Sequence, residues 1–376
     1  MPSPLSLRRP RAADLAAGRP APGSARRRLT RRTSLVCGGL VLALGLLVVV
    51  SGAVGSVAVT TTQAAQIVIG HLVPGMPWMS DGSLTPLQDQ AVWQFRLPRA
   101  LLAGLAGAGL ALAGALMQVT VRNPLAEPYI LGVSSGASVG AVLVIVFGSA
   151  ALGGLSLNLA AFAGALGACL CVAALARKDG ALSPTRMILA GVALGTLFSA
   201  ITSYLTISTS AQNVVSVLFF LLGSVSAATM SSLTGPVLAL AAAVVVAALL
   251  ARSLNALMTG DESAVSLGVD ATRLRGLLLV VASLLTGTVV SVAGGIGFVG
   301  LVVPHVARIV VGADHRRMLP VTVLGGAAFL MGADLLARTV ASPTEIPLGI
   351  LTAFVGAPFF LWLMRRGGAE RAGFGR

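Results

Sequence analysis

Charged residues are scarce in this chain of 376 residues, of which 10% are charged and 56% are hydrophobic. Soluble domains carry about 25% charged residues. So large a deficit excludes a soluble globular protein, because a surface this apolar needs lipid as its solvent. Since unpaired backbone groups are costly in lipid, the composition predicts an all-α polytopic membrane protein.

Aromatic residues are also few, at 5%, although the formal net charge is +14. The basic residues lie in short runs between apolar stretches. A surface that binds single-stranded nucleic acid interleaves basic and aromatic side chains. We therefore attribute the positive charge to membrane topology and expect no nucleic-acid partner.

Cysteine and lysine are nearly absent. The cysteines all fall in apolar stretches and are expected to be small buried residues; they are Cys37, Cys169 and Cys171. The three histidines are far apart in the sequence. We expect no metal site. The one lysine, Lys178, is followed by Asp179. The chain thus lacks the Gly-Lys-Ser/Thr sequence of a P-loop, and any ATP must be used by a separate subunit.

Two short motifs resemble catalytic signatures. Residues 132–136 match the G-x-S-x-G nucleophile elbow, and 295–300 match the dinucleotide fingerprint G-x-G-x-x-G. The first requires a strand–turn–helix context and the second a βαβ unit. Both lie in apolar, small-residue runs typical of membrane helices, so we expect no enzyme activity. A membrane hydrolase using Ser134 or Ser135 is the alternative.

Apolar stretches long enough to cross a bilayer, about 20 residues each, recur along the chain. Gly294, Gly295 and Gly297 divide one uncharged block into two pieces. Glycines at four-residue spacing predict close helix packing in lipid; they are Gly132, Gly136 and Gly140, and Gly191 and Gly195. Ten spans are predicted, at 35–59, 98–119, 129–149, 154–176, 187–207, 234–251, 276–293, 296–312, 319–337 and 347–364, which makes 35–366 the membrane domain.

The basic residues define an orientation for ten spans. If the Arg-rich segment 1–34 is cytoplasmic, 23 of the 26 basic residues lie on the cytoplasmic side. The positive-inside rule describes this bias. We therefore expect a multi-pass protein of the bacterial inner membrane with both termini cytoplasmic. We also expect 1–34 to be a disordered tail and 367–376 a second cytoplasmic tail.

Three arginines, Arg96, Arg99 and Arg338, are predicted outside and so break the rule. They could anchor helix ends at the membrane interface. They could instead form a cationic docking surface for an acidic soluble partner. Asp334 lies four residues before Arg338 and could hold its side chain.

Several ordered motifs resemble the FecCD-type permease family, whose members import iron–siderophores, haem and cobalamin through ABC transporters. The resemblance covers about 96–366 and implies the ten-helix architecture of a type II ABC importer permease. The motifs are Arg-Leu-Pro-Arg at 96–99, Arg-Asn-Pro-Leu-Ala-Glu-Pro at 122–128, Leu-Ala-Gly-Val-Ala-Leu-Gly at 189–195, Gly-Asp-Glu-Ser-Ala at 260–264, Gly-Phe-Val-Gly-Leu-Val-Val-Pro-His at 297–305 and Glu-Ile-Pro-Leu-Gly at 345–349.

The resemblance implies roles for three groups of residues. The excursion 253–275 resembles the loop of two short helices that couples such permeases to the ATPase subunit, and its residues here are Gly260, Asp261, Glu262, Ala264, Leu267 and Gly268. The second group is the docking set, Arg96, Arg99 and Arg338, which would meet a binding protein. The third resembles a cytoplasmic gate, where plain turn chemistry is the alternative; it contains Asn123, Leu125 and Thr185.

The resemblance also implies partners: two ATP-binding cassette subunits, a soluble or lipid-anchored binding protein, and a second permease subunit. The chain itself would bind no cofactor. We expect an iron–siderophore-like chelate as substrate. An ion-coupled secondary transporter is the alternative, but such coupling needs ionisable groups within the membrane, and the predicted spans contain one carboxylate, Asp334.

Overall fold

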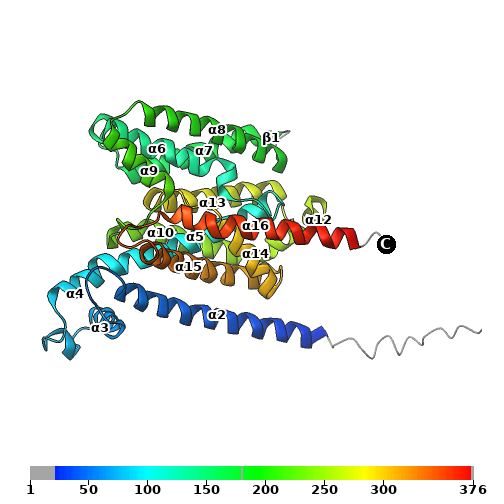
Figure 1. Cartoon of the computed structure of the whole chain (residues 1–376). Coiled ribbons are helices and arrows are strands. Elements are labelled where there is room, and N and C mark those ends of the chain that lie inside the picture. The colour runs from blue at the N-terminus through cyan, green and yellow to red at the C-terminus, as the bar shows by residue number, and fades with distance from the viewer. Residues whose placement is uncertain (1–21, 179–180, 374–376) are drawn as a thin grey trace, which may run out of the picture.

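A computed structural model describes residues 22–178 and 181–373, nearly all of them in helices or short connections (Figure 1). The strands in this part of the chain are β1 (Arg177–Lys178) and β2 (Ala181–Leu182). They form an antiparallel ribbon in which Arg177 lies opposite Leu182. The all-α fold class is therefore confirmed.

Ten helices correspond to the ten predicted spans. Among the described residues, seven helical stretches are long and apolar enough to cross a membrane, and α6, α14 and α16 are shorter apolar helices. The ten are α2 (Pro22–Ala53), α5 (Leu97–Thr120), α6 (Val133–Phe147), α7 (Leu157–Ala176), α8 (Pro184–Ile207), α10 (Thr234–Leu249), α13 (Ala271–Ala293), α14 (Val299–Val311), α15 (His315–Thr339) and α16 (Leu348–Gly373).

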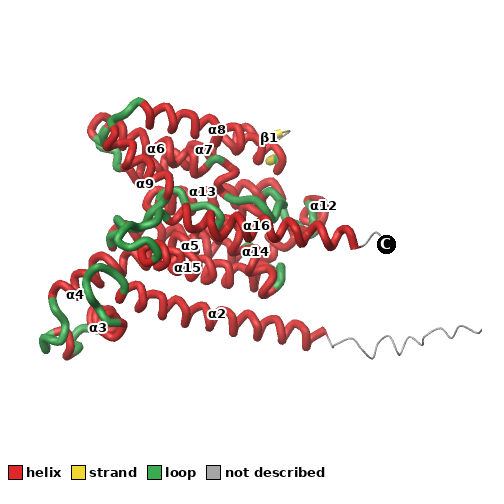
Figure 2. The backbone as a smooth tube through the Cα atoms, viewed as in Figure 1, coloured by secondary structure: helices red, strands yellow, loops and turns green. Residues whose placement is uncertain are grey.

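Short helices connect these spans, and Figure 2 shows the loops gathered at the two ends of the bundle. They are α3 (Thr61–Leu72), η1 (Pro77–Met79), α4 (Pro86–Gln90), the π-helix η2 (Ala91–Arg96), η3 (Pro128–Leu131), η4 (Ala150–Leu152), α9 (Ala211–Leu222), η5 (Met230–Leu233), α11 (Ala251–Met258) and α12 (Asp261–Ser266). The helix α9, of 12 residues, was not predicted; it is a shorter apolar helix, as α6, α14 and α16 are.

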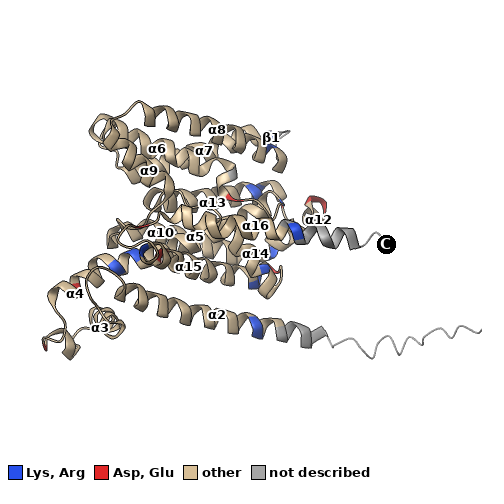
Figure 3. Ribbon diagram, viewed as in Figure 1, with Lys and Arg blue, Asp and Glu red and all other residues tan. Residues whose placement is uncertain are grey.

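The bundle has two chemically different ends. We call the end that holds α12 and the start of α2 the basic end, and the end that holds α3 and α4 the distal end (Figure 1). The helix α16 also finishes at the basic end, as an even number of crossings predicts. Figure 3 shows basic residues near α12 and on α2 at the basic end, and a second group near the junction of α4 and α5.

The N-terminal tail differs from its prediction. Residues 1–21 lie outside the described residues. Helix α2 already begins at Pro22, so the prediction of a disordered tail is wrong for residues 22–34. Arginine has a high helix propensity, and a helix extends readily from a formed turn. The basic segment 22–34 is therefore continuous with the first span.

The helix α5 forms the centre of the bundle. In the apolar 18-residue window of the helical stretch that contains it, 89% of the residues are buried. The helix packs against α10, α13, α14 and α15. Small residues permit this close packing: a side chain on Gly107 would collide with the backbone of Gly326, and one on Gly114 would collide with Gly300. The glycine spacings in α6 act in the same way, because Gly136 packs on Gly164.

The predicted helix break lies where the glycines placed it. Helix α13 ends at Ala293, Gly294 adopts φ +68°, and α14 begins at Val299. The preceding residue, Phe298, also has positive φ, at +67°. Gly295 and Gly297 therefore lie in a turn between two helices, and Gly300, the last glycine of the fingerprint, lies in the first turn of α14.

Candidate functional site

The excursion 253–275 contains two short helices, as predicted, at the basic end of the bundle. Helix α11 follows α10 through the C-cap Leu250, and α12 begins at Asp261. Thr259 and Gly260 lie between them, and Gly260 has φ +120°, a conformation that a side chain would strain. Gly268 at φ +79° closes the excursion before α13.

Asp261 is half-buried, with 42% of its side chain exposed, and its carboxylate is held by arginines. Its carboxylate accepts two hydrogen bonds from Arg275, of 2.6 Å from Nη2 and 2.9 Å from Nη1, and Arg122 Nη1 lies 3.4 Å away. The hydrogen bond from Arg275 holds the pKa of Asp261 below its ordinary value. Arg275 is buried and also donates from Nε to the carbonyl of Thr120, at 3.1 Å. This one guanidinium group therefore connects α12 and α13 to the end of α5.

The other side of α12 faces outward. Glu262 is exposed, and two apolar side chains, Val265 and Leu267, are 63% and 68% exposed. Ala264 is fully buried and packs the helix onto the bundle. An outward surface with one carboxylate and two apolar side chains is suited to contact with another protein.

Helix α11 is also attached to the bundle. Asn255 Nδ2 donates to Asp314 Oδ1 at 2.8 Å, and Asn255 Oδ1 accepts from the backbone N–H of His315 at 3.0 Å. Asp314 is the N-cap of α15. The excursion 253–275 is thus tied to α5, α13 and α15, and its coupling role stays a prediction.

The predicted gate residues lie at the same end of the bundle. Asn123 forms a tight turn after α5, in which its side-chain Oδ1 accepts from the backbone N–H of Leu125 at 2.9 Å. Thr185 is exposed in the first turn of α8. The segment η3, which follows this turn, packs against α8. The turn chemistry is therefore present, and the gating role stays a prediction.

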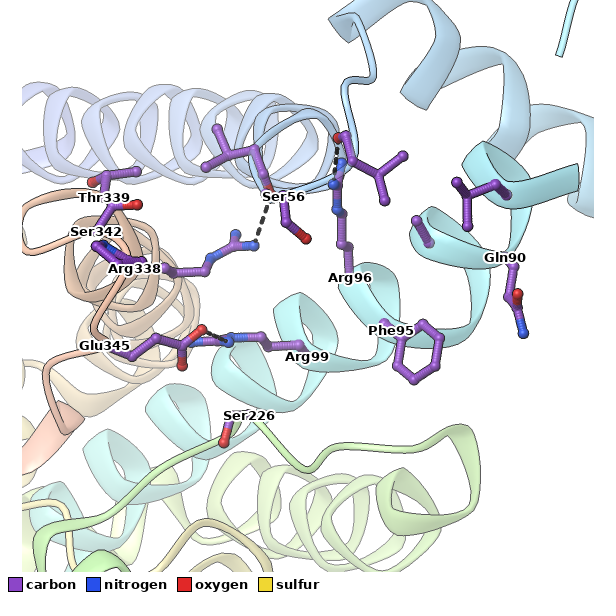
Figure 4. A pocket seen from close by; sticks show the side chains of 16 residues that line it. Ser56, Gln90, Phe95, Arg96, Arg99, Ser226, Arg338, Thr339, Ser342 and Glu345 are labelled. Atoms are coloured by element: carbon purple, nitrogen blue, oxygen red, sulfur yellow. Dashed lines mark hydrogen bonds and ion pairs between the residues drawn. The ribbon is translucent and has the colours of Figure 1, made fainter. Parts of the chain in front are cut away.

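At the distal end, the three outlying arginines line one hollow of about 680 Å³ (Figure 4). Arg96 is 7% exposed. It donates to the carbonyls of Gly52 at 2.8 Å, Ala53 at 3.1 Å and Val57 at 2.6 Å. It therefore satisfies carbonyl groups at and after the C-terminus of α2, which no later helical N–H can reach.

The other two arginines share a carboxylate. Arg99 donates to Asp334 at 2.9 Å and to Glu345 at 2.8 Å (Figure 4). Arg338 Nε lies 3.4 Å from Asp334, an ion pair at the predicted four-residue spacing. Its guanidinium also donates to the carbonyl of Val54 at 3.2 Å. The three arginines are largely committed within the chain, and only Glu345, with 45% of its side chain exposed, is open to solvent. Their docking role stays a prediction.

Sequence reasoning missed Arg275, Val265 and Asn255. Arg275 lies 155 residues from the carbonyl that it binds, so no local pattern reveals the contact. Val265 belongs to the 260–269 motif, but nothing in the sequence shows that its side chain is exposed. The G-x-S-x-G motif lies at the start of helix α6, where Ser134 is 2% exposed, without the strand that a nucleophile elbow requires.

Comparisons with known proteins agree with this architecture. The cobalamin import system permease BtuC of Halobacterium salinarum is 44% identical over 323 residues, 83% of this chain and 85% of the relative. The vitamin B12 import system permease BtuC of Klebsiella pneumoniae is 38% identical over 78% of this chain and 88% of its own length. A solved inward-facing structure of a putative metal-chelate type ABC transporter superposes with a TM-score of 0.76 at 33% identity, covering 89% of this chain and 99% of that chain.

The family model of the FecCD transport family matches residues 39–366, nearly the whole membrane domain. The match includes the excursion with α11 and α12, and the distal hollow with its three arginines. The chain therefore belongs to the FecCD transport family and is an ABC importer permease.

Proposed function

We propose that this permease carries a cobalamin-type corrinoid, delivered by a binding protein and driven by separate ATPase subunits. The relatives named for a substrate are cobalamin or vitamin B12 permeases. These names support a corrinoid over the iron–siderophore expected from the family alone. Both are bulky, polar metal chelates, so they require a passage of similar kind.

The substrate is proposed from the names of these relatives, and the observation that carries the proposed transport path is a hydroxyl stripe on α8. In the apolar 18-residue window of this helix, only 11% of the residues are buried within the single chain. Thr196, Ser199 and Ser203 are exposed and lie on one face at helical spacing. Hydroxyl groups gain little from facing lipid, whereas an uncharged polar lining suits a large polar chelate. We infer that a second permease subunit covers α8 and that the passage runs between the two.

In this proposal the ATPase subunit docks at the basic end. Glu262, Val265 and Leu267 form the outward face of α12, which we name the coupling face. An ATPase subunit that binds this face would act on α5, α13 and α15 through the contacts of Arg275 and Asn255. In this scheme the basic end and both termini are cytoplasmic, as the positive-inside rule favours.

The proposed binding protein docks at the distal end. Glu345 is the exposed partner of Arg99, whereas Asp334 is buried. A carboxylate of the binding protein could take the place of Glu345 and keep Arg99 paired. Docking by exchange of partners needs no free cation, and so fits the internal pairing of these arginines.

Ion-coupled transport by the chain alone is less well supported. Asp334 is the one carboxylate of the predicted spans, and it is paired with both Arg99 and Arg338. Its side chain is 1% exposed, so it offers no open carboxylate to a coupling ion.

Transport by reconstituted complexes tests the proposal. The chain, its ATPase subunit and its binding protein are placed in liposomes, and uptake of radiolabelled cyanocobalamin is compared with that of a ferric hydroxamate siderophore. We expect ATP-dependent uptake of cobalamin, and none from the permease alone under a proton or sodium gradient. Preferential uptake of the siderophore would overturn the substrate assignment, and gradient-driven uptake by the permease alone would overturn the mechanism.

A further inference from the structure

An apolar cleft of about 300 Å³ lies between α10 and α15 near the basic end. Its walls come from α5, the second half of α10, the start of α11 and the first turns of α15. Apolar side chains form nearly all of the lining, which consists of Leu112, Val244, Ala247, Ala248, Ala251, His315, Arg316, Leu319, Pro320, Val323 and Leu324.

The cleft faces the lipid side of the bundle. Val244, which lines it, is 38% exposed, and its neighbours on α10, Val245 and Leu249, are 57% and 78% exposed. Large apolar side chains exposed to this extent on a membrane helix contact acyl chains. The medium around the cleft is therefore hydrocarbon.

The end of the cleft toward the membrane surface is basic. Arg316 belongs to the lining and is exposed, and Arg252, also exposed, directly follows the lining residue Ala251. Neither guanidinium forms an ion pair within the part of the chain that the structure describes.

The neighbouring polar groups are occupied by contacts of their own. Asp314 accepts from Asn255 Nδ2 and from the backbone N–H of Arg316, at 2.8 and 3.1 Å. The His315 ring nitrogen Nδ1 is hydrogen-bonded to Asn255 Oδ1 at 2.6 Å. Arg316 thus brings positive charge to the lining of the cleft, and Arg252 adds a second guanidinium group one residue beyond that lining.

We propose that this cleft binds an anionic phospholipid, with one acyl chain between α10 and α15 and the phosphate beside Arg316 and Arg252. Basic pockets between membrane helices at the cytoplasmic side are suited to anionic headgroups. The acyl chain matches the apolar lining, and the phosphate matches the two guanidinium groups. A zwitterionic lipid would fill the cleft but would gain little from these charges.

Such a lipid would lie next to the coupling excursion. Helix α10 leads into α11 at Ala251, and α11 is held to the start of α15 by Asn255. A lipid between α10 and α15 would thus contact two of the elements that position α11. This consequence depends on the proposed function, whereas lipid binding itself does not.

Native mass spectrometry of the purified permease tests the proposal, with phosphatidylglycerol and phosphatidylcholine of equal chain length titrated separately. We expect the wild type to bind phosphatidylglycerol more tightly. Arg316→Gln should weaken that binding about fivefold, and Arg252→Gln with Arg316→Gln about 25-fold, because each arginine near the surface is worth about fivefold in affinity. The matched control is Arg186→Gln, an exposed arginine at the same end that binds the carbonyl of Arg177; it should have no effect.

A second variant tests the acyl chain. Ala248→Trp, at an exposed lining position, should fill the cleft and reduce the binding of both lipids while the protein remains monodisperse and thermally stable. Equal affinity of the wild type for the two lipids would overturn the proposal. It would be overturned equally by the same loss in Arg186→Gln as in Arg316→Gln, or by unchanged binding in Ala248→Trp.

Discussion

Replacing Leu267 by alanine should weaken the binding of the ATPase subunit without disturbing the fold of the permease. Leu267 is 68% exposed on the coupling face. Full burial of a leucine side chain stabilises a complex by about 1.5–3 kcal/mol, so burial of the exposed two thirds contributes about 1–2 kcal/mol. Since 1.4 kcal/mol corresponds to a factor of ten, Leu267→Ala should weaken ATPase binding about tenfold.

The assay is binding of the ATPase subunit to the permease in nanodiscs, measured by biolayer interferometry. The matched control is Leu249→Ala, because Leu249 is 78% exposed but lies on α10, where we expect lipid. The control should bind the ATPase as the wild type does. Equal affinities of Leu267→Ala and Leu249→Ala would refute the assignment of the coupling face, and an unfolded variant would show as a lowered melting temperature in the same nanodiscs.

Three further predictions follow from the contacts described. Asp261→Asn should lower the thermal stability of the permease at pH 7, because the hydrogen bond from Arg275 depresses the pKa of Asp261. The stability that this carboxylate contributes is complete above the ordinary carboxyl pKa of about 4 and is lost as the pH falls below it. The melting temperatures of the wild type and the variant should therefore converge in acid. Glu345→Gln should increase the affinity of the permease for the binding protein, most clearly at low salt, because Glu345 no longer competes for Arg99. Weaker binding would contradict docking by exchange. Gly114→Ala should lower the yield of folded protein, because the new methyl group collides with the backbone of α14, and normal yield would contradict this packing.

The sequence predicts the spans well because lipid imposes a simple rule on them. The absence of charge marks each crossing, and the glycines at 294–297 indicate correctly where a long block divides. The same rule fails for α9, a shorter apolar helix that was not predicted, and for 22–34, where arginines that suggest disorder extend a helix.

The candidate site is less visible in the sequence. The motif at 260–268 identifies the excursion through family resemblance, but it does not show that Asp261 binds Arg275 whereas Glu262 is exposed without such a partner among the contacts described. Arg96 is recognisable only as an exception to the positive-inside rule. Its three backbone carbonyl partners leave no pattern in the sequence, because any residue supplies a carbonyl.

Cysteine labelling tests most directly that the coupling face is cytoplasmic and meets an ATPase. In a variant lacking Cys37, Cys169 and Cys171, cysteine is introduced at Glu262 on α12, or at the exposed Ser83 of the distal end. In intact cells, a membrane-impermeant maleimide should label position 83 and leave 262 unlabelled, while a bifunctional reagent joins 262 to the ATPase subunit. External labelling at 262, or its failure to cross-link to the ATPase, would contradict the account.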